Sequence, residues 1–366
     1  MSQEIPVLTL AELEGPDSDA RDAKIRLAFG RYGMIYLRDH GIEAARLEAL
    51  YARYLAWLAR PPEEKERFGR GEIWYQRGWT PPNTEKAVVA QGQPDFKECW
   101  FAMVEPPDPA LTAQYPELFA ENLWPEGEDE FRTLFLEIGG RLQALGLSLL
   151  RACARALDLP AETFCELVRG GAHVTRALKY LPLDETAIAR GILWGEEHTD
   201  FNLVTLLPGG RFQDAEGRPT APPGDGSGLF LRTPPSADEP RGRLVSGSPP
   251  PGCLVAQVGQ ELEILSGGTF LATPHVITAP RRPGLSRTSL AHFVHVHPHR
   301  TLFPLEPFRS PEAVERYRPP VLAGTYATKT MADIGLAPPS VLSRFGYRHY
   351  DRLASFRAEE DARGGE

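Results

Sequence analysis

The sequence predicts an α+β protein with a mainly β core, an antiparallel sandwich or jelly roll flanked by helices. Beyond Ala172, short apolar strand patterns alternate with turns rich in Gly and Pro, which is typical of such cores. Before it, residues 126–157 carry apolar side chains at spacings of three and four, which predicts a long helix on which the sheet rests. Many of the 35 Pro and 34 Gly lie within residues 207–252, which predicts long ordered loops.

The segment before the β-rich region alternates strands and helices. Residues 5–10 predict a short edge strand, and residues 18–32 predict a helix that ends at Gly33. Residues 34–37 predict a second strand, and a second helix follows that runs to about Leu58. The aromatic, Pro-rich residues 74–95 predict a loop or hairpin wall beside a cavity.

The β-rich region predicts six strands, at residues 174–181, 198–207, 228–232, 253–258, 270–276 and 288–297. The Pro-rich residues 233–251 lack an apolar period and form either a surface loop or a lid over the site. Helical patterns in residues 310–357 are expected to pack back on the first segment. We therefore divide the chain into segments 1–171, 172–309 and 310–366 of one compact unit.

Composition narrows the classes of partner. The chain of 366 residues has a formal net charge of -9, so no basic surface indicates nucleic acid or anionic lipid, and a small-molecule partner is expected. No run approaches the ~20 apolar residues of a membrane span, and the N-terminus lacks a signal-peptide pattern. These patterns predict a cytoplasmic protein, a monomer or weak homo-oligomer. The four cysteines lack CxxC spacing and are interpreted as buried thiols.

A metal site is predicted where a polar loop joins an apolar strand. His198 and Asp200 are two residues apart, so on an extended backbone their side chains point to the same side. His275 stands at the start of a later strand and can supply a third ligand. Two His and one carboxylate on one face of a metal suit non-haem Fe(II) that reacts with O2. Each residue alone is more simply a surface or hydrogen-bonded side chain.

A cation and a hydroxyl open the last strand of the predicted sheet. Arg287 and Ser289 share a face by the two-residue period of a strand. A guanidinium fork beside a hydroxyl suits a carboxylate, such as the far end of a metal-bound keto acid. An arginine exposed to water at a strand edge is the alternative.

Two further groups of polar residues carry weaker hypotheses. The histidines at positions 292, 295, 297 and 299 would form a second metal cluster, or a solvated strand exit. Glu196 and Glu197 would act as acid or base, remain solvated, or hold a ligand imidazole in place.

Several of these motifs resemble the isopenicillin N synthase-like branch of the 2-oxoglutarate- and Fe(II)-dependent dioxygenases, over nearly the whole chain. Residues 32–42 are similar to that family's N-terminal segment, and residues 258–268 to the turn before the distal His. The pattern His198-Thr199-Asp200 resembles the first ligand pair, and Arg287-Thr288-Ser289 resembles the Arg-x-Ser clamp. The insertion and the residues around 267–275 are similar to bacterial members, including ethylene-forming enzymes.

The resemblance implies a double-stranded β-helix and an enzyme of small-molecule or secondary-metabolite chemistry. His198, Asp200 and His275 would hold Fe(II), while Arg287 and Ser289 would bind the 5-carboxylate of 2-oxoglutarate. With O2, the expected reaction is hydroxylation, desaturation or ring formation, with succinate and CO2 as co-products. Many plant members place two Tyr before a Pro near the cosubstrate, whereas Leu181 takes the second position in this chain.

Substrate contacts are chosen from polar residues beside apolar surface in segments expected to line the mouth, namely Arg77, Trp79, Glu85, Arg176 and Phe201. Two rival functions stay open. One is an iron oxidase of the same fold that does not use 2-oxoglutarate. The other is a non-catalytic small-molecule-binding protein.

Overall fold

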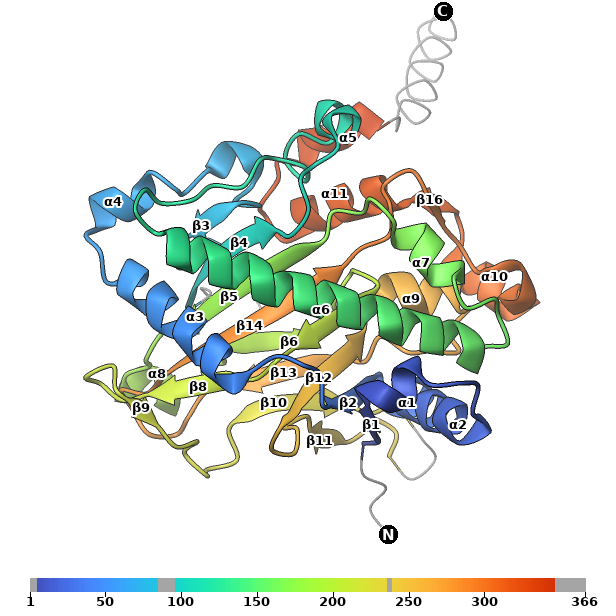
Figure 1. The fold of residues 1–366 in the computed structure, drawn as a ribbon, viewed down its shortest axis with the longest axis horizontal. Coiled ribbons are helices and arrows are strands. Elements are labelled where there is room, and N and C mark those ends of the chain that lie inside the picture. Colours follow the sequence, from blue (N-terminus) through green and yellow to red (C-terminus); the bar gives the residue numbers. More distant parts are fainter. Residues whose placement is uncertain (1–4, 85–95, 236–238, 346–366) are drawn as a thin grey trace, which may run out of the picture.

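Two β-sheets packed face to face form the centre of the protein (Figure 1). The computed structural model describes residues 5–84, 96–235 and 239–345. The major sheet has the order β1 (Val7–Thr9), β2 (Met34–Arg38), β12 (Cys253–Val258), β7 (Val204–Leu207), β14 (Ser286–Val294), β5 (Val174–Tyr180), β4 (Lys97–Met103) and β3 (Gly78–Thr80), with β8 (Gly210–Gln213) beside β14 and β9 (Pro219–Thr220) beside β8. The minor sheet has the order β11 (Leu244–Ser246), β10 (Gly228–Arg232), β13 (His275–Thr278) and β6 (Gly195–His198).

Helices cover the outer face of the major sheet, and further helices lie in the N-terminal and C-terminal segments. They are α1 (Leu10–Glu14), α2 (Asp19–Leu27), the π-helical turn η1 (Ala28–Tyr32), α3 (Ala44–Leu58), α4 (Pro62–Glu66), η2 (Gly71–Ile73), α5 (Pro109–Gln114), α6 (Asp129–Ala156), α7 (Thr163–Val168), α8 (Glu185–Ala189), α9 (Gln260–Leu265), η3 (Glu306–Phe308), α10 (Pro311–Tyr317), α11 (Ala323–Asp333) and η4 (Pro339–Phe345). The short strands β15 (Thr301–Leu302) and β16 (Val321–Leu322) pair before α11. None of the helices in the described part of the chain is both long and apolar enough to cross a bilayer.

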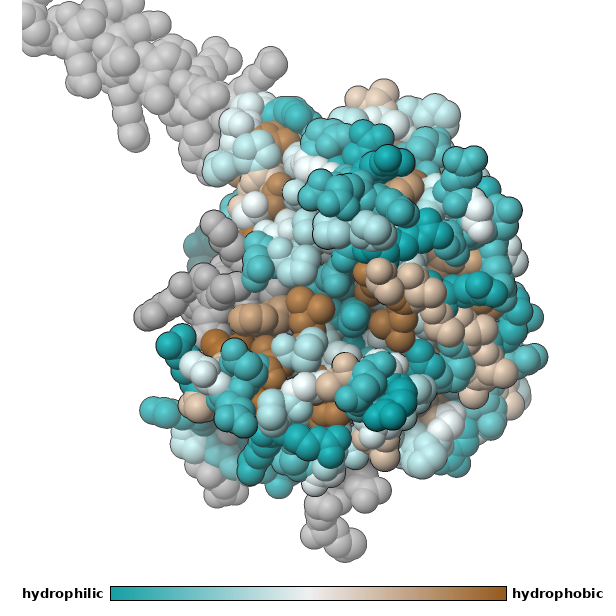
Figure 2. All heavy atoms as spheres, turned by 90° about the vertical axis from the view of Figure 1, so that its left-hand side faces the viewer, coloured by the Kyte–Doolittle hydropathy of each residue, from teal (hydrophilic) through white to brown (hydrophobic). Residues whose placement is uncertain are grey.

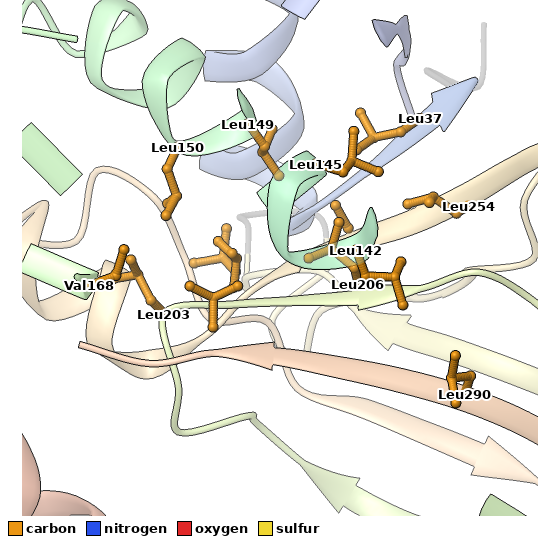
Figure 3. Packing of buried hydrophobic residues seen from close by; sticks show 14 of the residues in the cluster. Leu37, Leu142, Leu145, Leu149, Leu150, Val168, Leu203, Leu206, Leu254 and Leu290 are labelled. Atoms are coloured by element: carbon orange, nitrogen blue, oxygen red, sulfur yellow. The ribbon is translucent and has the colours of Figure 1, made fainter. Parts of the chain in front are cut away.

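Helix α6 is the platform of the major sheet. It carries one apolar stripe, and Leu142, Leu145 and Leu149 from that stripe are almost fully buried. Figure 3 shows these leucines above Leu206 of β7 and Leu254 of β12. Burying a leucine side chain contributes roughly 1.5–3 kcal/mol, so these three leucines stabilise the contact between the helix and the sheet.

The major sheet has two unlike faces, as the two-residue strand period requires. On β14, Leu290 and Val294 belong to the core under α6. The alternate residues Arg287, Ser289, Ala291 and Phe293 therefore face the minor sheet, and in β5 they pair with Tyr180, Leu178, Arg176 and Val174. Figure 2 looks at the end of the sandwich near β8 and α8, where hydrophobic side chains gather in the middle of the face.

The predicted fold class is confirmed, and the predicted elements at residues 5–10, 34–37, 126–157, 174–181, 228–232 and 253–258 correspond to β1, β2, α6, β5, β10 and β12. The single strand predicted at residues 198–207 is wrong. The chain leaves the minor sheet at His198 and enters the major sheet at Val204, so one apparent strand is two strands joined by a crossover. Residues 260–265, expected as part of a turn, form α9, which begins directly after Gly259.

Three segments differ in smaller ways. Strand β13 begins only at His275, because Pro274 precedes it, and β4 is a strand that the sequence pattern did not predict. The Pro-rich insertion supplies β11, which pairs with β10 at the edge of the minor sheet. At the C-terminal end, α11 packs on α5 and its surroundings through Tyr115 and Met331, as expected for a segment that returns to the first one. Residues 346–357 of that prediction lie outside the described residues.

Candidate metal centre and carboxylate clamp

Three potential metal ligands meet where the minor sheet ends. His198 closes β6, and His275 opens the neighbouring β13 directly opposite it. Asp200 follows in the crossover to β7. Its Oδ1 lies 3.7 Å from Nε2 of His198 and 3.8 Å from Nε2 of His275. One ligand atom of each residue lies within 4.8 Å of the others, and no other group of this kind occurs among the residues that the structure describes.

The hydrogen bond of His198 decides which ring nitrogen faces Asp200. Nδ1 of His198 lies 2.6 Å from the carbonyl oxygen of Glu196. A carbonyl only accepts, so Nδ1 must carry the proton and donate it. With its proton on Nδ1, the ring turns Nε2 to the space beside Asp200, which is the arrangement of a ligating histidine held by a backbone carbonyl.

The carboxylate of Asp200 is oriented by the start of β7. The hydroxyl of Thr205 donates to Oδ2 of Asp200 at 2.6 Å, which leaves Oδ1 toward the two imidazoles. The side chain of Asn202 donates to the carbonyl of Val204 at 2.7 Å and closes the crossover. Gly259 permits this loop, since a Cβ there would lie 1.9 Å from the carbonyl oxygen of Asn202.

His275 is buried and neutral. Burial, and then the neighbouring His198, lowers the pKa of His275 to about 4, although Asp200 opposes the shift. His198 is half exposed, with 50% of its side chain accessible, whereas Asp200 and His275 are 12% and 8% exposed. The set therefore opens to solvent on the His198 side.

The donor set fits a ferrous ion. Two neutral imidazoles and one carboxylate on one side of a point leave the remaining positions free, and this set suits non-haem Fe(II). Ligand atoms at about 2.0–2.2 Å from one ion on a shared face lie roughly 3 Å apart, so the atoms at 3.7 and 3.8 Å need to move inward only slightly to share one ion.

Arg287 and Ser289 lie side by side on the inner face of β14. Ser289 is buried, and the guanidinium of Arg287 lies 5.9 Å from the ring centre of Tyr180 in β5. Gly210 of β8 lies under the guanidinium, since a Cβ at that position would be 2.7 Å from one of its terminal nitrogens. Within the described chain no carboxylate forms an ion pair with Arg287, which leaves its fork available to an acidic ligand.

The five predicted substrate-wall residues separate into distinct places. Arg77 and Phe201 line one common cavity. Arg176 faces the interior between the sheets, with its guanidinium 4.7 Å from the ring centre of Phe101 and bonded to the sulfur of Cys99. Glu85 lies outside the described residues.

Trp79 is not in the mouth. It pairs with Trp100 across β3 and β4, its side chain belongs to the core under the helices, and its indole N–H donates to Glu98 at 3.0 Å. The prediction failed because residue alternation in β3 was not known. A shift of one residue along a strand moves a side chain to the opposite face of the sheet.

The weaker hypotheses are also resolved in part. Glu197 forms a two-pronged ion pair with Arg232 at 2.6 and 2.8 Å. It is the backbone carbonyl of Glu196, not its carboxylate, that holds the imidazole of His198. The later histidines do not form a second cluster in the described structure: His292 points toward α6 and bonds to Thr175 and Gln143, on the face opposite the clamp.

The residues that support the site were not predicted from the sequence, namely Asn202, Thr205, Gly210, Gly259 and Gln260. Gln260 accepts from Tyr326 and donates to Thr199 inside the crossover, so α9 and α11 both brace the ligand loop. A usable signal existed for two of them, since Asn202 and Thr205 interrupt an otherwise apolar run. Gly210 and Gly259 matter because atoms of other residues lie where their side chains would be, and such contacts cannot be read from the sequence.

Comparisons with known proteins agree with this geometry. A family model described as the N-terminal region of non-haem dioxygenases in morphine synthesis matches residues 5–127. Leucoanthocyanidin dioxygenase 1 of rice is 25% identical over 284 residues, which cover 74% of this chain and 66% of the rice protein. A proline hydroxylase of Petromyces alliaceus is 31% identical over 196 residues, covering 52% of this chain and 57% of the fungal protein. The aligned regions thus span two thirds or less of these relatives.

Solved structures extend the likeness to the whole fold. A protein of the 2OG-Fe(II) oxygenase family from Caulobacter crescentus gives a TM-score of 0.69 at 25% identity, covering 90% of this chain and 98% of that one. A dioxygenase for auxin oxidation in rice gives a TM-score of 0.65 at 20% identity, covering 93% and 99%. The sequence motifs, the jelly-roll fold and the relatives agree, and together they support the superfamily of 2-oxoglutarate- and Fe(II)-dependent oxygenases for this chain.

Proposed function

We propose that the protein is a non-haem Fe(II)- and 2-oxoglutarate-dependent oxygenase that oxidises a small organic or amino-acid-derived molecule. The reaction would be a hydroxylation, a desaturation or a ring formation with O2, and it would yield succinate and CO2. The observation that carries the proposal is the convergence of His198, Asp200 and His275 within 4.8 Å, at the edge of an interior that also contains Arg287.

Each residue of the site has a distinct task in this proposal. His198, Asp200 and His275 would hold the iron. Arg287 and Ser289 would bind the far carboxylate of 2-oxoglutarate and fix its direction between the two sheets. Thr205 keeps one oxygen of Asp200 pointed at the imidazoles. The bound iron supplies the redox chemistry with O2 and 2-oxoglutarate, and the protein supplies orientation and a site shielded from water.

Anaerobic titration tests the proposal. Fe(II) followed by 2-oxoglutarate should produce the weak visible charge-transfer band of a keto acid chelated to iron. No band, together with no Fe(II) binding by equilibrium dialysis, would overturn the proposal in favour of a non-catalytic binding protein. Fe(II) binding without 2-oxoglutarate binding would favour an iron oxidase that does not use this cosubstrate.

The setting of the enzyme is part of the proposal. We infer a cytoplasmic enzyme, a monomer or weak homo-oligomer, that acts on a free small molecule and not on nucleic acid; the net charge of -9 supports the last point. The names of relatives, among them naringenin,2-oxoglutarate 3-dioxygenase and azadirone synthase, favour secondary-metabolite chemistry. The proposed segments 1–171, 172–309 and 310–366 would act as one unit, and the likeness to bacterial members stays a prediction.

A further inference from the structure

A small cavity lies on the side of Asp200 that faces away from the clamp. It has a volume of about 30 Å³. A water molecule needs roughly 10–15 Å³ by this kind of measure, so the cavity accommodates about two waters, or one carboxylate group in their place. Its polar lining comes from Arg77, His295, Glu261 and Gln76, and Phe201 forms part of its wall.

The guanidinium of Arg77 is buried in this cavity, and the carboxylate that acts on its charge, that of Glu121, is not part of the cavity lining. The side chain is 1% exposed. It donates to the carbonyl oxygens of Ala120 at 3.0 Å and Leu118 at 2.6 Å, and to that of Gln76. In the described structure no carboxylate forms an ion pair with it. Carbonyl dipoles only partly offset the cost of burying a charge, so an anion in the cavity would be strongly favoured.

The other titratable groups in the cavity do not balance this charge. Glu261 is buried, and burial raises its pKa well above its usual range, which favours the uncharged acid. Burial, with His173 adding to it, lowers the pKa of His295 to about 3, so that ring is neutral as well. Burial lowers the pKa of Arg77 to about 9, which still leaves it protonated at pH 7. Arg77 therefore supplies the positive charge of the cavity lining.

The register of β14 places the cavity relative to the proposed iron site. Thr205, whose hydroxyl bonds to Asp200, lies directly opposite Phe293 in the ladder of β7 and β14. Arg287 lies toward one end of β14 from Phe293, and His295 lies just past the other end. The ring of His295 is 5.1 Å from the ring of Phe201, the residue after Asp200. The clamp and the cavity thus flank Asp200 on opposite sides.

We infer that this cavity is the anchor for a carboxylate on the oxidised substrate, which Arg77 binds through its two remaining N–H groups while the rest of the molecule passes Phe201 toward the iron ligands. This inference rests on the proposed function, because 2-oxoglutarate would occupy the space between Asp200 and Arg287, and the side near Phe201 would then be open to the substrate. The substrate class is a small organic acid. Neutral analogues of the same shape would leave the guanidinium unpaired.

A matched acid and amide test the inference without turnover. The probes are 4-fluorophenylacetate and 4-fluorophenylacetamide, and binding is followed by fluorine NMR on protein that holds Fe(II) and excess 2-oxoglutarate without O2. The acid should bind about tenfold more tightly than the amide or better, since a hydrogen bond between two charged groups is stronger than one to a neutral group. Equal binding of both probes, or no binding of the acid, would overturn the inference.

Three variants assign the effect to the cavity. Arg77→Met should remove the preference for the acid, whereas Arg46→Met, which removes an exposed arginine paired with Glu137, should leave it unchanged. Ala327→Leu fills the cavity from α11 and leaves the hydrogen-bond partners of Arg77 unchanged, so it should weaken binding of the acid at least about tenfold. This variant keeps the test valid if Arg77→Met does not fold. An acid preference that persists in both cavity variants would refute the inference.

The same samples separate this inference from the proposed function. If the charge-transfer band with 2-oxoglutarate forms in the wild type and in the Ala327→Leu protein, the iron and clamp assignments hold whatever the probes do. If the band is absent in every protein, the proposed function fails first, and acid binding to the cavity is then measured on the metal-free protein.

Discussion

The two halves of the proposed cofactor site are built in different ways. Arg287 and Ser289 lie in β14, which pairs with β5 on one side and with β8 and β7 on the other, so their backbone is fixed by strand ladders. His198 and Asp200 lie where a strand of the minor sheet ends and a crossover begins. The imidazole of His198 is held by the backbone carbonyl of Glu196. The orientation of Asp200 and of the crossover depends on hydrogen bonds from single side chains, mainly those of Thr205, Asn202 and Gln260.

This difference separates two ways in which the protein holds a ligand. The clamp is rigid because strand β14 is held by its neighbours on both sides. A substitution at a neighbouring residue should therefore leave Arg287 and Ser289 in place. The iron set is held by a network in which one lost hydroxyl can turn a ligand. We therefore expect the iron half to respond to substitutions around it and the clamp half to respond mainly to substitutions within it.

Removal of the iron carboxylate should have the largest effect. Asp200→Ala takes away the one anionic ligand and should lower turnover by at least about a thousandfold, because two neutral imidazoles bind Fe(II) weakly and its charge stays uncompensated. Substrate-dependent succinate formation measures turnover, and circular dichroism checks the fold. Asp333→Ala removes an exposed carboxylate paired with Lys329 and should have no effect. Full activity of Asp200→Ala would show that the iron assignment is wrong.

Loss of the clamp cation should be next in size. Arg287→Met should raise the dissociation constant of 2-oxoglutarate roughly 30- to 1000-fold, since two charge-assisted hydrogen bonds are lost, with little change in Fe(II) binding. Anaerobic titration of the charge-transfer band gives both constants. The matched control is Arg211→Met on the adjacent strand β8. Arg211 pairs in register with Thr288, its side chain contacts Glu48, and its loss should leave 2-oxoglutarate binding unchanged. Equal effects of the two variants would contradict the clamp.

A supporting residue of the iron half should give a smaller but diagnostic effect. Thr205→Val keeps the shape and removes the hydroxyl that orients Asp200, which should weaken Fe(II) binding about 10- to 100-fold. Equilibrium dialysis under nitrogen measures this. Thr328→Val removes a buried hydroxyl that bonds to a backbone carbonyl in α11 and is the matched control. If both variants bind Fe(II) like the wild type, the iron half is not more sensitive to its surroundings than the clamp half.

Sequence alone could predict the central sheet and the residues that meet in the site. The apolar runs of β5 and β12 and the long stripe of α6 are strong local signals, because one face of each is buried over most of its length. His198, Asp200 and His275 were placed together from residue type and spacing, and the structure brings them within reach of one another.

The missing parts depend on contacts between residues distant in sequence. The crossover after His198 lies within a continuous β-like pattern, and only the pairing of β6 with β13 and of β7 with β12 and β14 shows that the chain changes sheets there. The sequence pattern places Trp79 in the mouth. Its actual position follows from the register of β3 against β4, which tertiary pairing fixes and the sequence does not show. Arg77 is predicted as a residue of the substrate wall, but nothing local indicates that three carbonyl groups bury it.

The smallest expected effect is a pH dependence of the free energy of unfolding, and it comes from His173, which contacts His295 of the proposed substrate cavity. His173 is buried, and its Nδ1 accepts the backbone N–H of His295 at 3.1 Å, which requires a neutral ring. Burial lowers the pKa of His173 from 6.5 to about 4. Between these values the unfolded chain binds a proton that the folded chain does not, so the free energy of unfolding falls as the pH drops from 6.5 to 4. Each pH unit costs up to about 1.4 kcal/mol.

Urea unfolding at about pH 7.5, 6 and 5 measures this dependence, and His173→Asn isolates it. The Asn side-chain oxygen can still accept the N–H of His295 but does not titrate, so the variant should lose less stability on acidification than the wild type. Other buried histidines, among them His292, titrate in both proteins and cancel in the comparison of slopes. Parallel pH profiles would mean that the ring of His173 charges in the folded state, and that the region behind the cavity opens to water more readily than its burial indicates.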